Sequence, residues 1–384
     1  MGHDGVMAAF TKRGTPAAIA AEAAGLNDLA RAAWAGGAPV VRLLSHSSPR
    51  GSRLDTALLS PASPSASAAE EFARRLAVTH AHCPEGSRVF GQAPAGLVHG
   101  GRTGDGVMGA APLPLVAPDS RPRSFGEFYA EDRLLAYLSA ARANGSIDED
   151  GARVLHRLAD RLREGAFDAP QPALVHTDAA LLHGDLWSGN LYWATRESAA
   201  RGAVGAAERE AEGRRTGEGG CVAVLIDPAS QGGHAESDLA QLTVFGAPFT
   251  DRIYAAYDEA SPLADGWRER RVSSTACTSS SSMRPSSEGL TAGRRSERHQ
   301  PTRRQSQPAS RSVRARAARV GLRRTEACKP AYKPRTGYIS TSSAFSSAAT
   351  SRRILATASR VCRTCAISVS ANSRFLASNA TPSS

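Results

Sequence analysis

Hydrophobic and polar residues follow two different spacings along the first 271 residues of the chain. Apolar residues three or four positions apart predict helices over 16–35, 67–79, 125–142, 151–164, 238–245 and 252–260. Short apolar runs predict strands at 39–44, within 181–193 and within 221–227. Residues 84–122 are rich in glycine and proline, which predicts a loop. The mixture of helices and strands predicts an α+β protein.

Two segments lack the apolar residues that a packed core requires. Residues 194–220 contain Val204 as their single large apolar side chain, so we expect a solvated insertion there. Residues 272–384 contain 25 serines in 113 positions and almost no apolar periodicity, which predicts a disordered tail. The core is therefore expected between the N-terminus and residue 271, outside the insertion.

The positive charge of the chain is concentrated in this tail. The whole chain has a net charge of +11, and residues 272–384 alone carry 20 basic and 3 acidic side chains. The remaining body is mildly acidic, so its charge gives no reason to expect nucleic-acid binding. Electrostatic attraction of nucleic acid to the tail is the competing interpretation, but the tail has no interleaved aromatic residues or recognisable module. We therefore expect no nucleic-acid partner.

Features of membrane and secreted proteins are missing from the sequence. No apolar run approaches the ~18 residues that a membrane span needs, and the first residues lack the apolar stretch of a secretory signal. Four of the six cysteines lie in the tail, which does not suggest a disulfide framework. We expect a cytoplasmic protein without a membrane partner.

Three polar residues carry the candidate chemistry. Asp185 and Asn190 lie five positions apart on a glycine-containing loop after an apolar run, and Asp227 ends a second apolar run. Phosphoryl transfer from ATP requires a group that orients the acceptor hydroxyl and oxygen ligands for Mg²⁺. This order of residues matches H-x-D-x-x-x-x-N followed by a separate metal-binding aspartate. We interpret the pattern as a phosphotransfer site rather than as polar residues in ordinary turns.

The same segments resemble a known family. HGDLWSGN (183–190) with IDPASQGGHAESDLAQLTVFG (226–246) is similar to the fructosamine kinases, within the aminoglycoside phosphotransferase and choline kinase group. The resemblance extends over nearly all of 8–270, through segments such as FTK (10–12), AEAAGL (21–26) and FGEFYAEDRLLAYL (125–138). It implies a two-lobed protein-kinase-like α+β fold with a mostly helical C-terminal lobe.

The resemblance implies a role for each residue of a nucleotide site, with ATP and Mg²⁺ as cofactors. Asp185 would be the catalytic base for a sugar hydroxyl, and Asn190 and Asp227 would be Mg²⁺ ligands. Lys12 would contact the ATP phosphates, and Glu22 would pair with Lys12. Taken singly, Lys12 is also compatible with an ordinary surface lysine.

Substrate residues are implied in the same way. Trp187 would offer an aromatic face to the sugar or its amine carrier, although a core position is the alternative. His234 and Glu236 lie where the family approaches its substrate. His183 would shape the catalytic loop, and Asp238 would cap a helix and anchor that loop.

The resemblance also divides the chain. We expect an N-terminal nucleotide-binding lobe over 1–60, a C-terminal catalytic lobe over 61–271 and the Ser/Arg-rich tail over 272–384. Few residues precede the lysine strand, so the N-terminal lobe is expected to be truncated and to lack the hairpin that covers ATP. The tail replaces the apolar helices of the family, and a shifted reading frame would turn its serine codons into leucine codons. We therefore favour an out-of-frame tail over a functional basic one.

The predicted function is an ATP-dependent kinase that phosphorylates a sugar hydroxyl of a fructosamine or ketosamine. Its substrate would be a small sugar-amine or glycated amine. One alternative is a phosphotransferase for another hydroxylated amine, such as an aminoglycoside. The other is a catalytically inactive, kinase-like binding protein that uses the basic tail for interaction.

Overall fold

The computed structural model describes residues 7–47, 52–99, 102–103, 106–108, 111–206 and 220–270. All of them belong to one compact unit. The predicted tail over 272–384, with its basic charge and its suspected change of reading frame, lies outside the described residues. Within the described part, no helix is long and apolar enough to cross a membrane.

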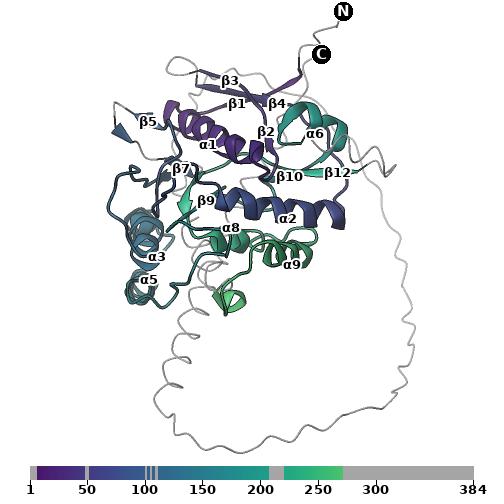
Figure 1. Ribbon diagram of the computed structural model, residues 1–384. Helices are drawn as coiled ribbons and strands as arrows, with labels where there is room; N and C mark the ends of the chain where they lie inside the picture. Colours follow the sequence, from purple (N-terminus) through teal and green to yellow (C-terminus); the bar gives the residue numbers. More distant parts are fainter. Residues whose placement is uncertain are drawn as a thin grey trace, which may run out of the picture. The chain divides into compact units, whose positions relative to one another are not determined.

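Strands and helices alternate along the described chain (Figure 1). The strands are β1 (Ala9–Arg13), β2 (Val40–Val41), β3 (Leu43–Ser47), β4 (Arg53–Ala57), β5 (Val98–His99), β6 (Arg102–Thr103), β7 (Gly106–Met108), β8 (Ala111–Leu113), β9 (Ala180–Leu182), β10 (Leu191–Thr195), β11 (Ala203–Val204), β12 (Cys221–Leu225) and β13 (Gln231–Gly233). The helices are α1 (Pro16–Trp34), α2 (Ala66–Ala81), α3 (Phe125–Phe128), η1 (Tyr129–Leu134), η2 (Leu135–Tyr137), α4 (Leu138–Ala143), α5 (Glu149–Arg163), α6 (Arg196–Gly202), α8 (Ala235–Gln241) and α9 (Thr250–Ala260). The predicted α+β class is confirmed.

A three-stranded antiparallel sheet with β4 in the centre holds the N-terminal part of the fold. α1 lies beside this sheet (Figure 1). Thr15 caps the helix by accepting from the Ala18 N–H at 3.2 Å, and Pro16 occupies the first turn, where its missing N–H costs nothing. The buried face of α1 includes Ile19 and Leu26. The helix packs against β3 and β4, in the same sheet as the strand that carries Lys12.

A second sheet, ordered β10-β12-β2-β11, brings the two predicted motif strands together. β10 and β12 are antiparallel, with Leu191 opposite Leu225. The Ile226 N–H donates to the Asn190 carbonyl at 3.1 Å, which extends the pairing by one step. The ends of both motif segments therefore meet at one edge of the sheet. The predicted lobe boundary at residue 60 stays a prediction.

α2, α8 and α9 gather below these sheets (Figure 1). Ser65 caps α2, which begins at Ala66, one residue before the predicted start. Phe72 and Leu76 of α2 and Tyr257 of α9 are buried in the main hydrophobic core. This core supports the sheet from below and fixes the elements that carry the site.

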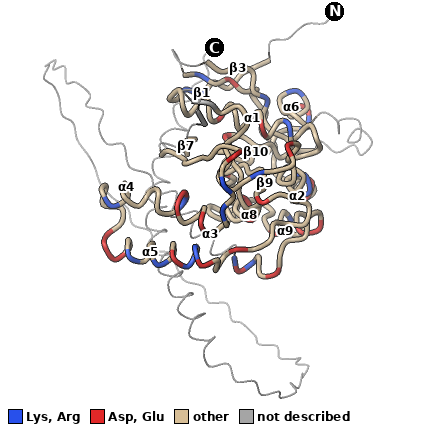
Figure 2. Tube along the Cα trace, turned by 60° about the vertical axis from the view of Figure 1, so that its left-hand side comes forward, with Lys and Arg blue, Asp and Glu red and all other residues tan. Residues whose placement is uncertain are grey.

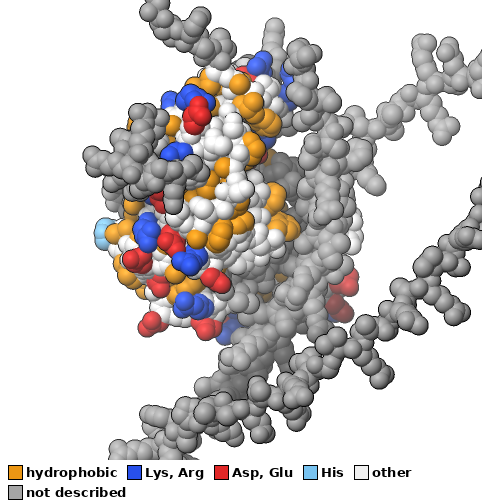
Figure 3. Space-filling view, turned by 90° about the vertical axis from the view of Figure 1, so that its right-hand side faces the viewer, with side chains coloured by type: hydrophobic (Ala, Val, Ile, Leu, Met, Phe, Trp, Pro, Cys, Tyr) orange, Lys and Arg blue, Asp and Glu red, His pale blue; other side chains and the backbone are white. Residues whose placement is uncertain are grey.

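α5 shows the amphipathic pattern that its sequence predicts. Leu155, Leu158 and Leu162 are buried on one face, and Asp148 caps the first turn. Basic and acidic side chains are interspersed along the helix (Figure 2). Where the described residues are visible in Figure 3, charged groups of both signs are also intermixed.

The helix predicted over 125–142 is present, but it is not a regular α-helix throughout. The segment is divided into α3, the π-helical turn η1, the 3₁₀ turn η2 and α4. Tyr129 and Leu134 are five positions apart and both are buried, at 6% and 3% exposure. A π-helical turn, with its i to i+5 hydrogen bonds, places residues of that spacing on one face, whereas an α-helix would separate them.

Residues 84–122, predicted as a loop, also include short strands. It contains two short hairpins, in which β5 pairs with β6 and β7 pairs with β8. These strands are two or three residues long, which is too short for an alternating pattern to appear in the sequence. Leu113 of β8 is nevertheless 1% exposed, so the second hairpin packs into the protein.

The solvated insertion expected over 194–220 is wrong for residues 194–206. Its first part forms the end of β10, then α6 and β11, and β11 pairs with β2. Ala199 and Ala203 are buried in the main core, and Val204 is 7% exposed. Small alanine side chains fill a narrow space between sheet and helix, so the lack of large apolar residues did not mean exposure. Residues 207–219 lie outside the described residues.

Shortening Val204 to alanine is expected to lower the free energy of unfolding by about 1–2 kcal/mol, because two buried carbon groups leave the core. Urea unfolding followed by circular dichroism measures this. Arg201→Ala, at an exposed position of α6, is the matched control and should change stability by less than about 0.5 kcal/mol. Equal stability of V204A and the parent protein would show that β11 does not contribute to the core.

Candidate active site

A tight turn after β9 begins the loop that carries Asp185. Gly184 has a φ of +83°, and a Cβ atom there would collide with the carbonyl oxygen of Ala229. Glycine is therefore required at this position for both its conformation and its size. The loop then returns through Trp187 into β10.

Two buried side chains of α8 hold this loop by its backbone. Asp238 accepts from the N–H groups of His183 at 2.7 Å and Gly184 at 3.0 Å. Gln241 accepts from the Leu186 N–H and donates to the Gly184 carbonyl at 3.0 Å. The expected anchoring role of Asp238 is thus confirmed. Its expected capping role is wrong, because α8 begins three residues earlier and His234 is its N-cap.

Asn190 connects the two motif segments. Its Nδ2 donates to the Asp185 carboxylate at 3.0 Å and to the Asp185 carbonyl at 2.8 Å, and lies 3.5 Å from the Asp227 carbonyl. Because the amide nitrogen of Asn190 makes these bonds, its amide oxygen is directed away from these acceptors. Asp227 has a φ of +52°, a left-handed conformation that is uncommon outside glycine. Such strain is often found at functional sites, where the surroundings maintain it.

Lys12 reaches the same place from β1. Its Nζ lies 2.7 Å from Glu22 Oε2 and 3.4 Å from Asp227 Oδ2. Burial works to lower the pKa of Lys12, but the negative charges of Asp227 and Glu22 outweigh it and raise this pKa above its ordinary value. Burial raises the pKa of Glu22, against the attraction of Lys12. The lysine therefore stays charged at neutral pH and is held beside an aspartate.

The five predicted nucleotide-site residues, Lys12, Glu22, Asp185, Asn190 and Asp227, are therefore connected by direct contacts. Carboxylate and amide oxygens are the ligands that Mg²⁺ prefers, and the Asp227 carboxyl is 45% exposed and accessible. A lysine ammonium beside that carboxylate suits phosphate oxygens. This donor set fits a magnesium–nucleotide complex.

The chain is similar to known proteins in both sequence and fold. The family model described as fructosamine kinase matches residues 6–273. The chain belongs to the fructosamine kinase family. A crystal structure from Thermobifida fusca, assigned as a fructosamine-3-kinase, is 30% identical, with coverage of 71% of this chain and 78% of that chain and a TM-score of 0.52. One from Haemophilus somnus is 22% identical, with 71% and 76% coverage and a TM-score of 0.50, and it shows likeness of fold alone. The predicted protein-kinase-like fold is confirmed.

Curated relatives match shorter stretches of this fructosamine kinase family member. A protein from Synechocystis, assigned as a ketoamine kinase, is 33% identical over 168 residues, which is 44% of each chain. The chloroplastic protein-ribulosamine 3-kinase of Arabidopsis thaliana is 30% identical over 145 residues, covering 38% of this chain and 34% of its own. The chain thus spans less than half the length of these curated relatives.

The predicted substrate residues are not gathered in the same way as those of the nucleotide site. His234 is buried, and its Nε2 lies 3.2 Å from the carbonyls of Ala169 and Pro170. Glu236 is 5% exposed and pairs with Arg270 at 2.7 Å. Internal contacts therefore occupy both side chains.

Trp187, by contrast, lies at the surface of the catalytic loop. Its ring meets that of Phe245 edge to face, with 5.4 Å between the centroids. Phe245 is 52% exposed, so the pair forms an open aromatic ledge in this member of the family. Phe245 was not identified from the sequence, although it belongs to the VFG segment that follows α8.

Two further buried side chains behind the loop, His80 and Tyr257, were not identified from the sequence. His80 of α2 lies 3.3 Å from Asp238 Oδ2 through Nε2 and 2.7 Å from the Tyr257 hydroxyl through Nδ1. All three side chains are buried. No motif marks His80, whose contact with Tyr257 arises from the packing of α2 against α9. The chain of bonds links the main core to the catalytic loop.

Acid is expected to destabilise the protein through buried histidines. Burial lowers the pKa of His183 and of His234 below the ordinary value of about 6.5. The unfolded chain therefore binds more protons as the pH falls through 6.5, and stability present above that pH is lost, by up to about 1.4 kcal/mol per pH unit and histidine.

Thermal unfolding at pH 7.5, 6.5 and 5.5 tests this expectation, and the melting temperature should fall at each step. H234N should show a shallower fall, because one of the two groups is removed. His156→Asn, at an exposed position, should keep the profile of the parent protein. A melting temperature that is constant between pH 7.5 and 5.5 contradicts the prediction.

Proposed function

We propose that this chain transfers the γ-phosphoryl group of ATP to a hydroxyl of a small ketoamine. The supporting observation is the contact of Lys12 with both Glu22 and Asp227, next to Asn190 and Asp185. These side chains come from four separate segments, and their joint chemistry is that of a nucleotide phosphotransfer site. Ketoamine and ribulosamine kinases among the relatives support the acceptor class.

Each side chain has a distinct task in this proposal. The Asp185 carboxylate accepts the proton of the acceptor hydroxyl, and the Asn190 amide holds that carboxylate in place. Lys12 binds the phosphates of ATP, and Glu22 orients Lys12. Asp227 and the oxygen of Asn190 hold Mg²⁺, which supplies neutralisation of the charge on the phosphates. Catalysis thus depends on positioning and charge, without a covalent intermediate on the protein.

The acceptor would lie on the ledge formed by Trp187 and Phe245. Aromatic faces suit both the C–H face of a sugar and a cationic amine. For His234 and Glu236 we propose a positioning role instead of substrate contact, because both are buried and bonded within the protein. The cytoplasmic location stays a prediction.

An acceptor-dependent ADP assay tests the proposal. The purified full-length chain is given ATP and Mg²⁺ with fructosyl-glycine, with an aminoglycoside, or without an acceptor. We expect ADP formation with the ketoamine well above the rate without acceptor, together with a phosphorylated product in the mass spectrum. ADP formation with the aminoglycoside alone would favour the other hydroxylated amines. Binding of ketoamine without any ADP would favour the inactive, kinase-like binding protein.

A further inference from the structure

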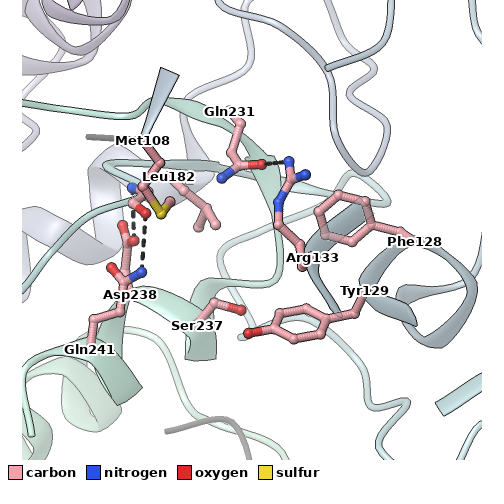
Figure 4. A pocket seen from close by; sticks show the side chains of 10 residues that line it. Met108, Phe128, Tyr129, Arg133, Leu182, Gln231, Ser237, Asp238 and Gln241 are labelled. Carbon is pink, nitrogen blue, oxygen red and sulfur yellow. Dashed lines mark hydrogen bonds between the residues drawn. The ribbon is translucent and has the colours of Figure 1, made fainter. Parts of the chain in front are cut away.

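A small cavity lies beside the catalytic loop, outside the nucleotide site (Figure 4). Its wall includes Gly184 of the loop, Gln231 of β13, Ser237 of α8, and Tyr129 and Arg133 of η1. The cavity measures about 30 Å³. A water needs roughly 10–15 Å³, so the cavity has room for two oxygen-sized atoms.

Among the described residues that line this cavity, Arg133 is the one basic side chain and Asp238 is the one carboxylate. It is 4% exposed. Its guanidinium donates to the carbonyls of Pro114 at 3.0 Å and Asp132 at 2.9 Å, and to the side-chain oxygen of Gln231. All three acceptors are neutral. Its Nε has no hydrogen-bond partner within the described part of the chain.

The two carboxylates around Arg133 are engaged elsewhere. Asp238 accepts from the N–H groups of His183 and Gly184. The Asp132 carboxyl pairs with Arg123 at 2.6 Å. Among the described residues, Arg133 itself forms no ion pair with a carboxylate. The ring of Phe128, 4.6 Å from the guanidinium carbon, gives partial compensation. Arg133 is therefore a buried cation without an ion-pair partner among the described residues.

A buried guanidinium raises the free energy of the folded protein unless an anion lies beside it. Burial lowers the pKa of Arg133 to about 10, and the guanidinium is therefore still charged at neutral pH. Buried charges in proteins are normally paired, and an unpaired one is strongly unfavourable. A guanidinium is well shaped to bind a carboxylate through two parallel hydrogen bonds. An anionic ligand group in the cavity would supply the missing counter-charge.

The position of the cavity connects this charge to the proposed acceptor. Gln231 contacts Arg133 and belongs to β13, which pairs with β9 next to the catalytic loop. Gly184, which also lines the cavity, directly precedes the catalytic Asp185. A ligand whose hydroxyl is at Asp185 can therefore extend another of its groups towards Arg133.

We propose that Arg133 binds the carboxylate of the amine carrier, so that the chain selects ketoamines of free amino acids over those of neutral amines. The inference rests on the proposed function, since it assigns a substrate class to that site. The cavity accommodates two oxygens, which favours a carboxylate over a larger phosphate. The hydroxyls of Ser237 and Tyr129 point towards one another across the same space (Figure 4).

Calorimetric titration of the full-length chain tests the inference without turnover. The probes are fructosyl-glycine, its methyl ester and a fructosamine 6-phosphate that carries a neutral amine. We expect the acid to bind at least tenfold more tightly than the ester. Stronger binding of the 6-phosphate than of the acid would assign the anion to the sugar and overturn the carboxylate proposal, as would equal binding of acid and ester or no binding of either.

Variants at the cavity distinguish a lost preference for the acid from a loss of folding. Gln231→Glu places a carboxylate beside Arg133 and should abolish the preference for the acid while the melting temperature is kept. R133M should abolish it as well, and neutral ester binding reports whether that variant is folded. Arg163→Gln, which removes an exposed arginine paired with Glu131, is the control and should keep the preference.

The proposed function and this inference can fail separately. A tenfold preference for the acid that is lost in Q231E supports the inference even where no ADP is formed, and in that case the proposed activity alone fails. Turnover of acid and ester with equal kcat/KM and equal binding supports the kinase activity and overturns the inference. A preference for the acid that persists in Q231E also overturns it.

Discussion

Replacement of Asp185 by asparagine is expected to lower kcat for ketoamine phosphorylation by roughly 10²–10⁴-fold. The carboxamide cannot accept the proton of the acceptor hydroxyl. The side chain is of equal size and lies on a half-buried loop, so no core packing is lost. Asp185 is also the acceptor of an Asn190 hydrogen bond that the carboxamide oxygen can still accept. The effect should therefore fall on turnover, with unchanged melting temperature and nearly unchanged KM for ATP.

Steady-state ADP formation by D185N and by the parent chain, at matched concentrations, measures this loss. Asp251→Asn, at an exposed position of α9, is the matched control and should keep the parental kcat. A kcat for D185N within threefold of the parent would remove Asp185 from the role of base.

Replacement of Asp238 by alanine should unfold or strongly destabilise the protein, at a cost of more than about 3 kcal/mol. Asp238 is 0% exposed and satisfies the N–H groups of His183 and Gly184 and the ring of His80. Without it, these buried donors lose their acceptor, and each such loss costs about 1–3 kcal/mol. The catalytic loop also loses its anchor, so any folded fraction should have little activity.

Urea unfolding of D238A against the parent chain gives the loss in free energy. Glu259→Ala is the control, because this carboxylate is 67% exposed in its pair with Arg74 and its loss should cost less than about 1 kcal/mol. A destabilisation of D238A below 1 kcal/mol would show that other groups hold the loop.

The candidate site was predictable to the extent that its residues lie in contiguous motifs. Asp185 and Asn190 are five positions apart in one loop, and that spacing lets Asn190 bond to both the carboxylate and the carbonyl of Asp185. Asp227 follows a strand whose partner in the sheet is the strand after that loop. The chemistry of these residues and the antiparallel pairing of the strands follow from local pattern.

Residues held by distant elements were not visible in the same way. His80, Gln231 and Arg133 carry no motif of their own, and their roles depend on which helix or strand packs beside them. His80 meets Tyr257 because α2 packs against α9. Arg133 faces the cavity because a π-helical turn interrupts an apparently regular helix. Side-chain spacing in the sequence does not encode either contact.

Local sequence is sufficient to predict the elements with long apolar periods and to point to the candidate catalytic groups, because both depend on neighbouring residues. α1, α2, α5 and α9 and the strands β10 and β12 follow from local spacing and capping. The packing of distant elements is needed to explain how alanine-rich α6 and β11 enter the core. It is also needed to explain why the buried Arg133 has no ion-pair partner among the described residues. Burial and charge compensation depend on what surrounds a side chain in space, and residues far apart in the chain provide those surroundings.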